Sequence, residues 1–435
     1  LFSVMEQFPN ARYTALLNKA RILSKSISGD GVEHSVDQLQ ETKAAWIEVE
    51  VTGRNHCEAQ VELSRIGIAL RENATVAQRM FRHDEVCVFK ADLWQLLASS
   101  LRGEQEWDLA AHAYDKLTTL VPDTLETRFW AGVLTILIDQ EQAVSHLAAA
   151  SSKEEYRRTA YELIGVANGI MPISNPEQAA KQLGIGYLSV GEPELALWQL
   201  SRAHRMNPAD STTLAYLGLA KIQLDQNGSE EIDSALSLDP DSALAHSVKG
   251  TFWLENQQCQ YSINEFGQAI HLDPTLALWQ IQLAQAYQMC GHPTKAVAAL
   301  EHAAELAPDD HKVWVELANL YLEVEGDGDL ALSAARNAVA SAPESPRALD
   351  SLGWAQLKAG EIRQAEVNLR AAVNLAPYEP AILYHLGVMY RNKGVESAAK
   401  EAFQKAIAMD VSCRACSKPK LGAVGALATR ALEQP

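Results

Sequence analysis

The sequence is poor in two residue classes whose scarcity excludes particular functions. It has six cysteines in 435 residues, at positions 57, 87, 259, 290, 413 and 416, a spacing too sparse and too irregular to predict a disulfide framework. Basic residues are outnumbered, with 37 Lys and Arg against 55 Asp and Glu and a formal net charge of −18. This negative field repels phosphate backbones and anionic membrane surfaces, so we expect no nucleic-acid partner.

Long apolar runs and a leader sequence are missing as well. The longest mostly apolar run covers residues 130–138, far below the roughly 20 residues that a transmembrane helix needs. We therefore expect a soluble chain without membrane insertion. No basic segment followed by an apolar core precedes Leu1, so a signal peptide or initiator Met has been removed or lies outside this chain, and the compartment stays open.

Catalytic signatures are absent too. The sequence contains no His-Glu-x-x-His, no phosphate-binding loop and no nucleophile elbow, which are the patterns that announce common hydrolytic and nucleotide chemistry. The pair Gly184 and Gly186 lacks the third glycine of a dinucleotide-binding loop. We therefore expect no catalysis, no cofactor and no resident metal.

What the sequence does contain is a repeat. Six prolines recur at intervals of 32, 34, 34, 35 and 34 residues, namely Pro208, Pro240, Pro274, Pro308, Pro343 and Pro377. Between consecutive prolines lie two apolar-periodic stretches of about a dozen residues, separated by a polar or glycine-containing turn, which predicts two amphipathic helices per repeat.

The residues at fixed positions within each repeat are similar as well. One repeat reads Leu183, Gly184, Tyr187, Gly191, Ala196, Leu200, Ala203 and Pro208, and a later one reads Leu352, Gly353, Gly360, Ala365, Leu369, Ala372 and Pro377. This pattern resembles the tetratricopeptide repeat family. The resemblance implies an all-α fold, a right-handed superhelical solenoid of antiparallel helix pairs, in which small residues such as Gly184 and Gly353 let paired helices approach closely.

The repeat pattern divides the chain into four predicted regions. Residues 177–411 form a regular array of about seven repeats, and within it the unit 209–240 is two residues short around Asn227 and Gly228, which predicts an irregular turn. Residues 91–176 form degenerate repeats and connecting helices, and residues 1–90 form a less regular helical region that begins inside a repeat. Residues 412–435 form a capping helix or a tail.

The resemblance also implies a binding surface, because first helices of such arrays line a concave groove that commonly holds a peptide or a partner's helix. The alternative is that these side chains pack against neighbouring helices. The basic clamp with which one subfamily grips chaperone tails is not present. Carried over by position, the predicted groove residues are Gln285, Gln288, Asn319, Leu322, Trp354, Leu357, Tyr384, His385 and Arg391.

Two cysteine pairs require separate interpretation. Cys413 and Cys416 form the only close pair, and the alternatives are a local disulfide in an oxidising compartment, a zinc half-site and plain thiols. Cys259 and Cys290 are about one repeat apart but occupy different positions within the repeat, so we expect them to pack in the core as thiols.

The sequence therefore predicts a non-catalytic scaffold that binds a partner protein or peptide. A first alternative is self-assembly, in which further copies of the chain stack head-to-tail through complementary end faces into a filament. A second is an adaptor, in which residues 1–90 contact one partner and the groove holds another.

Overall fold

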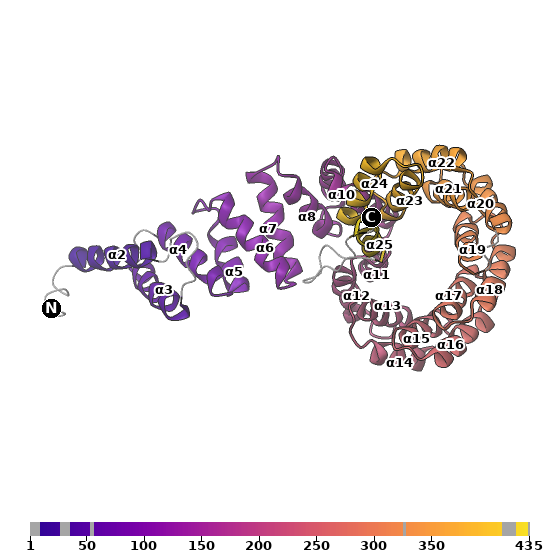
Figure 1. Ribbon diagram of the computed structural model, residues 1–435. Helices are drawn as coiled ribbons and strands as arrows, with labels where there is room; N and C mark the ends of the chain where they lie inside the picture. Colours follow the sequence, from indigo (N-terminus) through magenta and orange to yellow (C-terminus); the bar gives the residue numbers. More distant parts are fainter. Residues whose placement is uncertain (1–8, 27–34, 53–55, 325–327, 411–422, 434–435) are drawn as a thin grey trace. The chain divides into compact units, whose positions relative to one another are not determined.

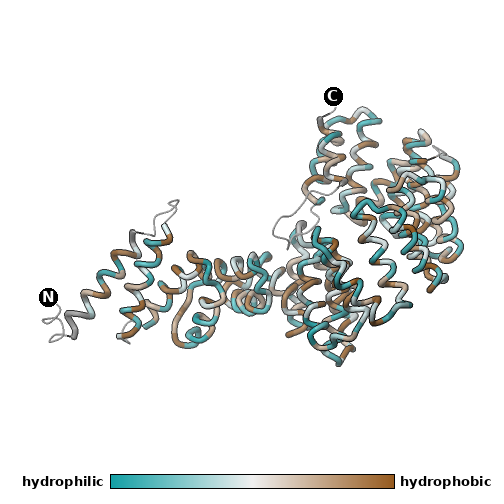
Figure 2. The backbone as a smooth tube through the Cα atoms, turned by 90° about the horizontal axis from the view of Figure 1, so that it is seen from below, coloured by the Kyte–Doolittle hydropathy of each residue, from teal (hydrophilic) through white to brown (hydrophobic). Residues whose placement is uncertain are grey.

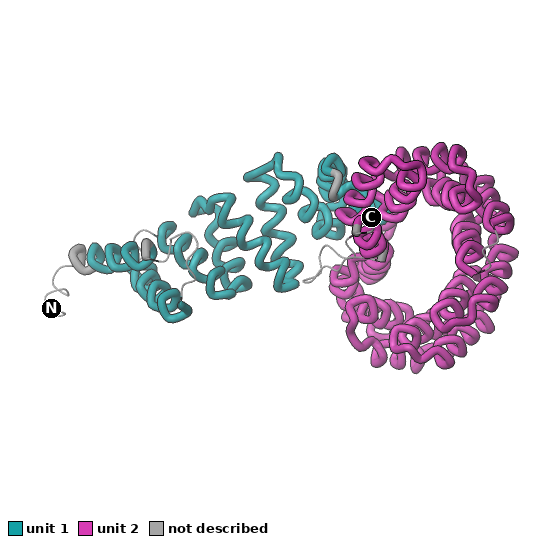
Figure 3. Tube along the Cα trace, in the orientation of Figure 1, with its two compact units in different colours: residues 1–167 teal, residues 168–435 magenta. Residues whose placement is uncertain are grey.

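The computed structural model describes residues 9–26, 35–52, 56–324, 328–410 and 423–433 (Figure 1). These residues form α-helices joined by short turns, with no β-strand among them, which confirms the predicted all-α fold. The chain groups into two compact units, residues 1–167 and 168–435 (Figure 3).

Unit 1 is a series of helices in which α2 to α9 each pack against the next. Its first three helices share a core in which Trp46 is buried and donates its indole N–H to Ser24 Oγ at 2.8 Å. The helices are α2 (Pro9–Ser26), α3 (Val36–Val51), α4 (His56–Ala69), α5 (Asn73–His83), α6 (Ala91–Gly103), α7 (Trp107–Leu120), α8 (Leu125–Thr135), α9 (Gln140–Ala150) and α10 (Glu154–Ile170), the last of which crosses the boundary between the units.

Unit 2 consists of helix pairs at the predicted spacing, closed by one extra helix. Its helices are α11 (Pro176–Ser189), α12 (Pro193–Met206), α13 (Ser211–Gln223), α14 (Ser229–Leu238), α15 (Ala243–Glu255), α16 (Cys259–Leu272), α17 (Ala277–Met289), α18 (Pro293–Leu306), α19 (His311–Val324), α20 (Gly328–Ser341), α21 (Pro346–Lys358), α22 (Ile362–Leu375), α23 (Pro380–Asn392), α24 (Glu396–Met409) and α25 (Ala423–Glu433).

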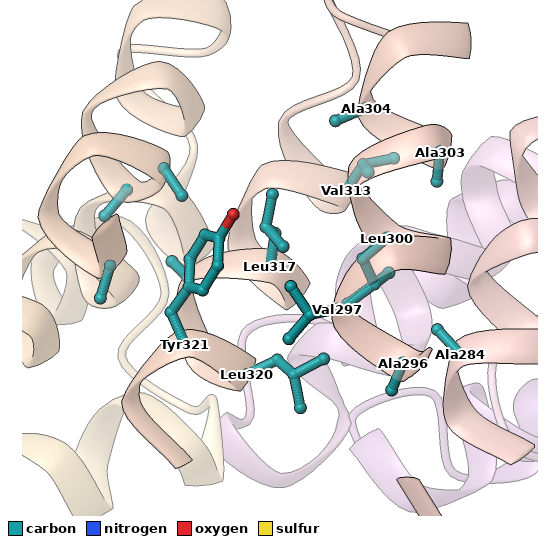
Figure 4. Packing of buried hydrophobic residues seen from close by; sticks show 14 of the residues in the cluster. Ala284, Ala296, Val297, Leu300, Ala303, Ala304, Val313, Leu317, Leu320 and Tyr321 are labelled. Atoms are coloured by element: carbon teal, nitrogen blue, oxygen red, sulfur yellow. The ribbon is translucent and has the colours of Figure 1, made fainter. Parts of the chain in front are cut away.

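Within unit 2, the odd-numbered first helices line the inner side of the superhelix and the even-numbered second helices its outer side (Figure 1). Apolar and polar residues recur along each helix (Figure 2), because a helix between two neighbours buries one wide face and exposes the other. A representative core lies between α17 and α20, where Val297, Leu300 and Leu317 interdigitate beside the buried Tyr321 (Figure 4).

Small residues set the distance between paired helices, as predicted. A Cβ added at Gly184 would lie 2.6 Å from Leu200 Cγ, and one at Gly353 would lie 2.7 Å from Leu369 Cγ. Both distances are well inside carbon–carbon contact at 3.5–4.0 Å. Only glycine therefore fits at these crossings without moving the second helix.

The turn between paired helices contains a residue with left-handed backbone. The φ angle is +77° at Gly191, +75° at Gly291 and +79° at Gly360, whereas Asp225 and Gln257 adopt the same conformation with a side chain. Glycine adopts this conformation without a steric penalty, whereas a residue with a Cβ atom incurs one. The turn therefore favours glycine, and the two exceptions among the described turns of unit 2 store local strain.

One helix departs from the common length. The second helices α12, α16, α18, α20, α22 and α24 each have 14 residues, whereas α14 has 10. α14 ends two residues before its repeat proline, Pro240, as α12, α16, α18, α20 and α22 do before theirs, so the missing residues are at the start of α14. This confirms the irregular turn predicted around Asn227 and Gly228.

Two disulfides correct the prediction for the cysteines. Cys57 at the start of α4 bonds Cys87 after α5, with Cα atoms 5.0 Å apart. Cys259 at the start of α16 bonds Cys290, which caps the end of α17, with Cα atoms 5.8 Å apart. The predicted thiol packing of Cys259 and Cys290 was wrong, because successive helices run antiparallel and the start of one lies beside the end of the next.

The last helix covers the end of the array. Ala428 and Ala431 of α25 are buried against Phe403 of α24 and Leu383 of α23. The Arg391 guanidinium donates to the Ala431 carbonyl oxygen at 2.6 Å, and a cation at the C-terminal end of a helix is favourable. The apolar face of the final repeat is thus covered by the chain itself.

Candidate functional site

A pocket of about 140 Å³ lies between the first helices α17 and α19 on the inner side of unit 2. Its polar lining comprises Gln285 and Gln288 from α17 and Glu316, Asn319 and Glu323 from α19. The Gln288 amide Nε2 donates to Glu323 Oε2 at 2.6 Å and links the two walls. The pocket therefore combines three amides with two carboxylates.

Helical spacing explains why these side chains meet. Glu316, Asn319 and Glu323 are three and four residues apart in α19, so they occupy one face of that helix. Gln285 and Gln288 are three apart in α17. The two helices run in the same direction in successive repeats, and their matching faces therefore form one surface.

The electrostatics of this pocket disfavour the charged form of Glu316. Partial desolvation raises the pKa of the Glu316 carboxyl, although the residue is exposed; Arg347 opposes this effect and the charge of Glu323 adds to it. A carboxyl group held with a raised pKa gains from a cation placed beside it. The pocket is therefore suited to a positively charged group of a ligand.

An aromatic cluster lies on α21 and α23, the next two first helices. The Trp354 ring stacks on His385 with centroids 4.2 Å apart and an interplanar angle of 15°, and Lys358 Nζ lies 4.4 Å from the centroid of the Trp354 ring. His385 Nδ1 is 2.9 Å from both Asp350 carboxylate oxygens, which fixes the imidazole against the ring. Trp354 remains half-buried and so presents apolar surface to solvent.

The nine predicted groove residues take different positions. Gln285, Gln288 and Asn319 line the pocket, and Trp354 and His385 form the stacked pair, with the half-buried Tyr384 ring 5.8 Å from His385. The remaining three have structural contacts. Leu322 is half-buried against the core between α17 and α20, Leu357 is buried, and Arg391 holds α25.

Four residues of the site, Glu316, Glu323, Asp350 and Lys358, were not among the predicted groove residues. The signal that could have found them is helical spacing, because each lies three or four residues from a predicted residue on the same helix or bonds one across the surface. Cys413 and Cys416 lie outside the described residues.

No cluster of three or more His, Cys, Asp or Glu residues among the described side chains is arranged to hold a metal ion. No described helix combines the length and the hydropathy needed to cross a lipid bilayer.

Two segments of unit 2 match models of a known protein family. Residues 276–320 and 351–410 each match a tetratricopeptide repeat model. The first range includes every pocket residue except Glu323, and the second includes Trp354 and His385. The chain contains tetratricopeptide repeats. Its 34-residue period, close-packing glycines and left-handed turns are the structural expression of that repeat.

Similar proteins include two from mammals. The human mitochondrial import receptor subunit TOM70 is 28% identical over 254 residues, which cover 53% of this chain and 42% of that protein. The bovine BBSome complex member BBS4 is 24% identical over 212 residues, covering 48% of this chain and 40% of that protein. The tetratricopeptide repeat chain thus spans about two fifths of the length of these relatives.

Among solved structures, the crystal structure of yeast Tom70 covers 98% of this chain and 95% of its own, at 13% identity and a TM-score of 0.47.

Proposed function

We propose that this tetratricopeptide repeat protein is a non-catalytic scaffold that binds a basic peptide segment of a partner protein along the first helices α17, α19, α21 and α23. The observation that supports this most directly is the pocket in which Gln285, Gln288 and Asn319 lie beside Glu316 and Glu323. Its amides and carboxylates are complementary to a peptide and to a cationic side chain.

The amide groups match the backbone of a bound peptide. Each Gln or Asn side chain carries both a donor and an acceptor, as does each peptide unit. Amide side chains on successive first helices can therefore form hydrogen bonds with the backbone of an extended peptide, whatever side chains that peptide carries. These hydrogen bonds contribute to the affinity for a peptide and do little to distinguish one peptide sequence from another.

The carboxylates supply specificity for charge. Glu316 and Glu323 lie on the same face of α19, and Glu323 accepts a hydrogen bond from Gln288. A Lys or Arg side chain in the pocket would relieve the desolvation that raises the pKa of Glu316. The net charge of −18 adds long-range attraction for a basic partner.

The stacked Trp354 provides an apolar anchor further along the same surface. Aromatic residues that are held rigidly and partly exposed are common at the centres of protein interfaces. Similarity to an import receptor subunit also supports a receptor or scaffold role for this chain. Head-to-tail stacking has no such support, because α25 covers the apolar face of the last repeat.

The experiment that tests this function compares two peptides by titration calorimetry. They are 12 residues long, neutral at their termini, and carry either four Lys or four Glu in a Gln-Ser background. We expect the Lys peptide to bind at low salt and the Glu peptide not to bind. The double variant Glu316→Gln/Glu323→Gln should weaken binding of the Lys peptide about tenfold, the scale of two partly screened charge pairs.

The matched control removes the same charge elsewhere. Glu305 on α18 and Glu344 before α21 are both exposed and do not line the pocket. Glu305→Gln/Glu344→Gln should therefore bind the Lys peptide as the wild type does. An equal loss in both double variants would show that net charge alone attracts the peptide, and the pocket assignment would be rejected.

A further inference from the structure

A second pocket, of about 500 Å³, lies between the shortened helix α14 and α15. It is lined by Ser229, Ile232 and Asp233 of α14 and by Lys249, Phe252, Trp253 and Asn256 of α15, together with Gln258 in the turn that follows. No residue of the pocket between α17 and α19 belongs to it. Its volume is within the range of ordinary ligand sites.

The pocket is located where the other repeats place protein. α14 lacks four residues at its start relative to the other second helices, a length of about 6 Å or one helical turn. The chain re-enters α14 at Gly228, where an added Cβ would lie 2.5 Å from the Gly218 carbonyl oxygen. The loop therefore passes close to α13 and does not fill the space of the missing turn.

Phe252 shows the consequence for packing. It occupies the position two residues after Gly250, the small residue of its first helix. At that position Phe252 is half-buried and lines the pocket. The residues at the same position in the other first helices of unit 2 are all buried: Gly186, Ala220, Ala286, Leu320, Ala355 and Met389.

Phe252 belongs to an aromatic platform. Its ring meets Trp253 edge to face with centroids 5.2 Å apart, and Trp253 lies 5.2 Å from Tyr261, which is 58% exposed. Such rings favour a further aromatic group in an offset or edge-to-face arrangement. The platform is therefore open to one more ring.

The charges around the platform neutralise each other. Lys249 Nζ lies 3.1 Å from Asp233 Oδ1, and both side chains line the pocket. The remaining polar lining is neutral, a hydroxyl from Ser229 and amides from Asn256 and Gln258. A ligand with a net charge gains nothing from this lining, so electrostatic complementarity favours a neutral group.

We propose that this pocket binds a neutral aromatic side chain carried on a helical turn of a partner protein, which supplies the turn that α14 lacks. α14 is about one helical turn shorter than the other second helices, and its first residue, Ser229, lines the pocket. The platform offers rings for stacking, and the charged lining, Lys249 and Asp233, sums to zero. The site is independent of the proposed binding of a basic peptide on the inner helices.

The test uses three probes with the full-length chain. The first is a 14-residue Ala-Gln helical peptide with one central Trp, the second is the same peptide with Ala in place of Trp, and the third is N-acetyltryptophanamide. Fluorescence anisotropy of labelled peptides, and competition by the unlabelled amide, measure the affinities. We expect the Trp peptide to bind at least tenfold more tightly than either other probe.

Two substitutions that fill the pocket complete the test. Ser229→Phe adds a ring from the α14 side of the pocket, and Asn256→Phe adds one from the end of α15. Each should weaken binding of the Trp peptide at least tenfold. Ser237→Phe is the matched control, because Ser237 is exposed on α14 and does not line the pocket. Circular dichroism reports whether each variant is folded, and either filled variant suffices if the other is not.

Three results would overturn the assignment. Equal binding of the Trp and Ala peptides would show that the platform does not select an aromatic ring. Unchanged affinity in a folded filled variant would place the binding elsewhere. Equal affinity for N-acetyltryptophanamide and the Trp peptide would show that the ligand is a free aromatic molecule and not a helical turn of a partner.

Discussion

Removal of the Cys259–Cys290 disulfide is expected to loosen the junction between α16 and α17. The bond closes a loop with a sequence separation of 31. The chain-entropy relation assigns a loop of this length an unfolded-state entropy loss of about 12 cal/mol/K, which is about 3.7 kcal/mol at 25 °C. The double variant Cys259→Ala/Cys290→Ala should lose that much stability against opening of the α16–α17 segment.

Amide hydrogen exchange with mass spectrometry measures this loss locally. A change of about 3.7 kcal/mol corresponds to an opening constant about 500-fold larger, so peptides from α16 and α17 should lose protection by up to that factor. Peptides from α8 and α9 of unit 1 are the internal control. The wild-type chain treated with dithiothreitol should show the same change. Protection within threefold of the oxidised wild type in both samples would refute the reasoning.

Three other predictions concern stability. Gly353→Ala should destabilise by about 1–3 kcal/mol through overpacking against Leu369, where the added Cβ lies 2.7 Å from Cγ, and an unchanged denaturant midpoint would contradict this. Gly360→Ala should lower the melting temperature by the equivalent of about 1–2 kcal/mol because φ is +79°, whereas Gln257→Gly, at φ +59°, should raise it. Glu316→Gln should stabilise the protein at pH 7, because the pKa of the Glu316 carboxyl is higher in the folded than in the unfolded state. The stability that the protonated carboxyl gives is complete below the unfolded pKa and is lost as pH rises through the folded pKa. The urea midpoints of wild type and variant should therefore converge in acid.

Much of unit 2 could be predicted from its sequence because one physical rule recurs in it. The same small, large and turn residues return about every 34 positions, so the repeat is specified many times over. The shortened unit with Asn227 and Gly228 was detectable for the same reason, as a departure from a strict period. Unit 1 lacks this redundancy, and individual helices such as α2 and α3 have no repeat motif to identify their neighbours.

The candidate site was less accessible to sequence reasoning because its residues depend on neighbours in space. Leu357 and Arg391 have the same position in the repeat as Gln288, yet Leu357 is buried and Arg391 bonds α25. The cysteine pairing was missed for a related reason. Cys259 and Cys290 were compared by position within the repeat, whereas antiparallel neighbours bring opposite ends of successive helices together.

The two disulfides also change how the chain responds to mechanical load. A force applied to the two ends of the polypeptide passes directly through the Cys57–Cys87 and Cys259–Cys290 bonds, and the residues enclosed by each bond carry no tension. With sequence separations of 30 and 31, each bond shortens the fully stretched chain by about 100 Å at roughly 3.5 Å per residue. The helical pairs α4–α5 and α16–α17 are thus shielded from unravelling by force until their bonds are reduced.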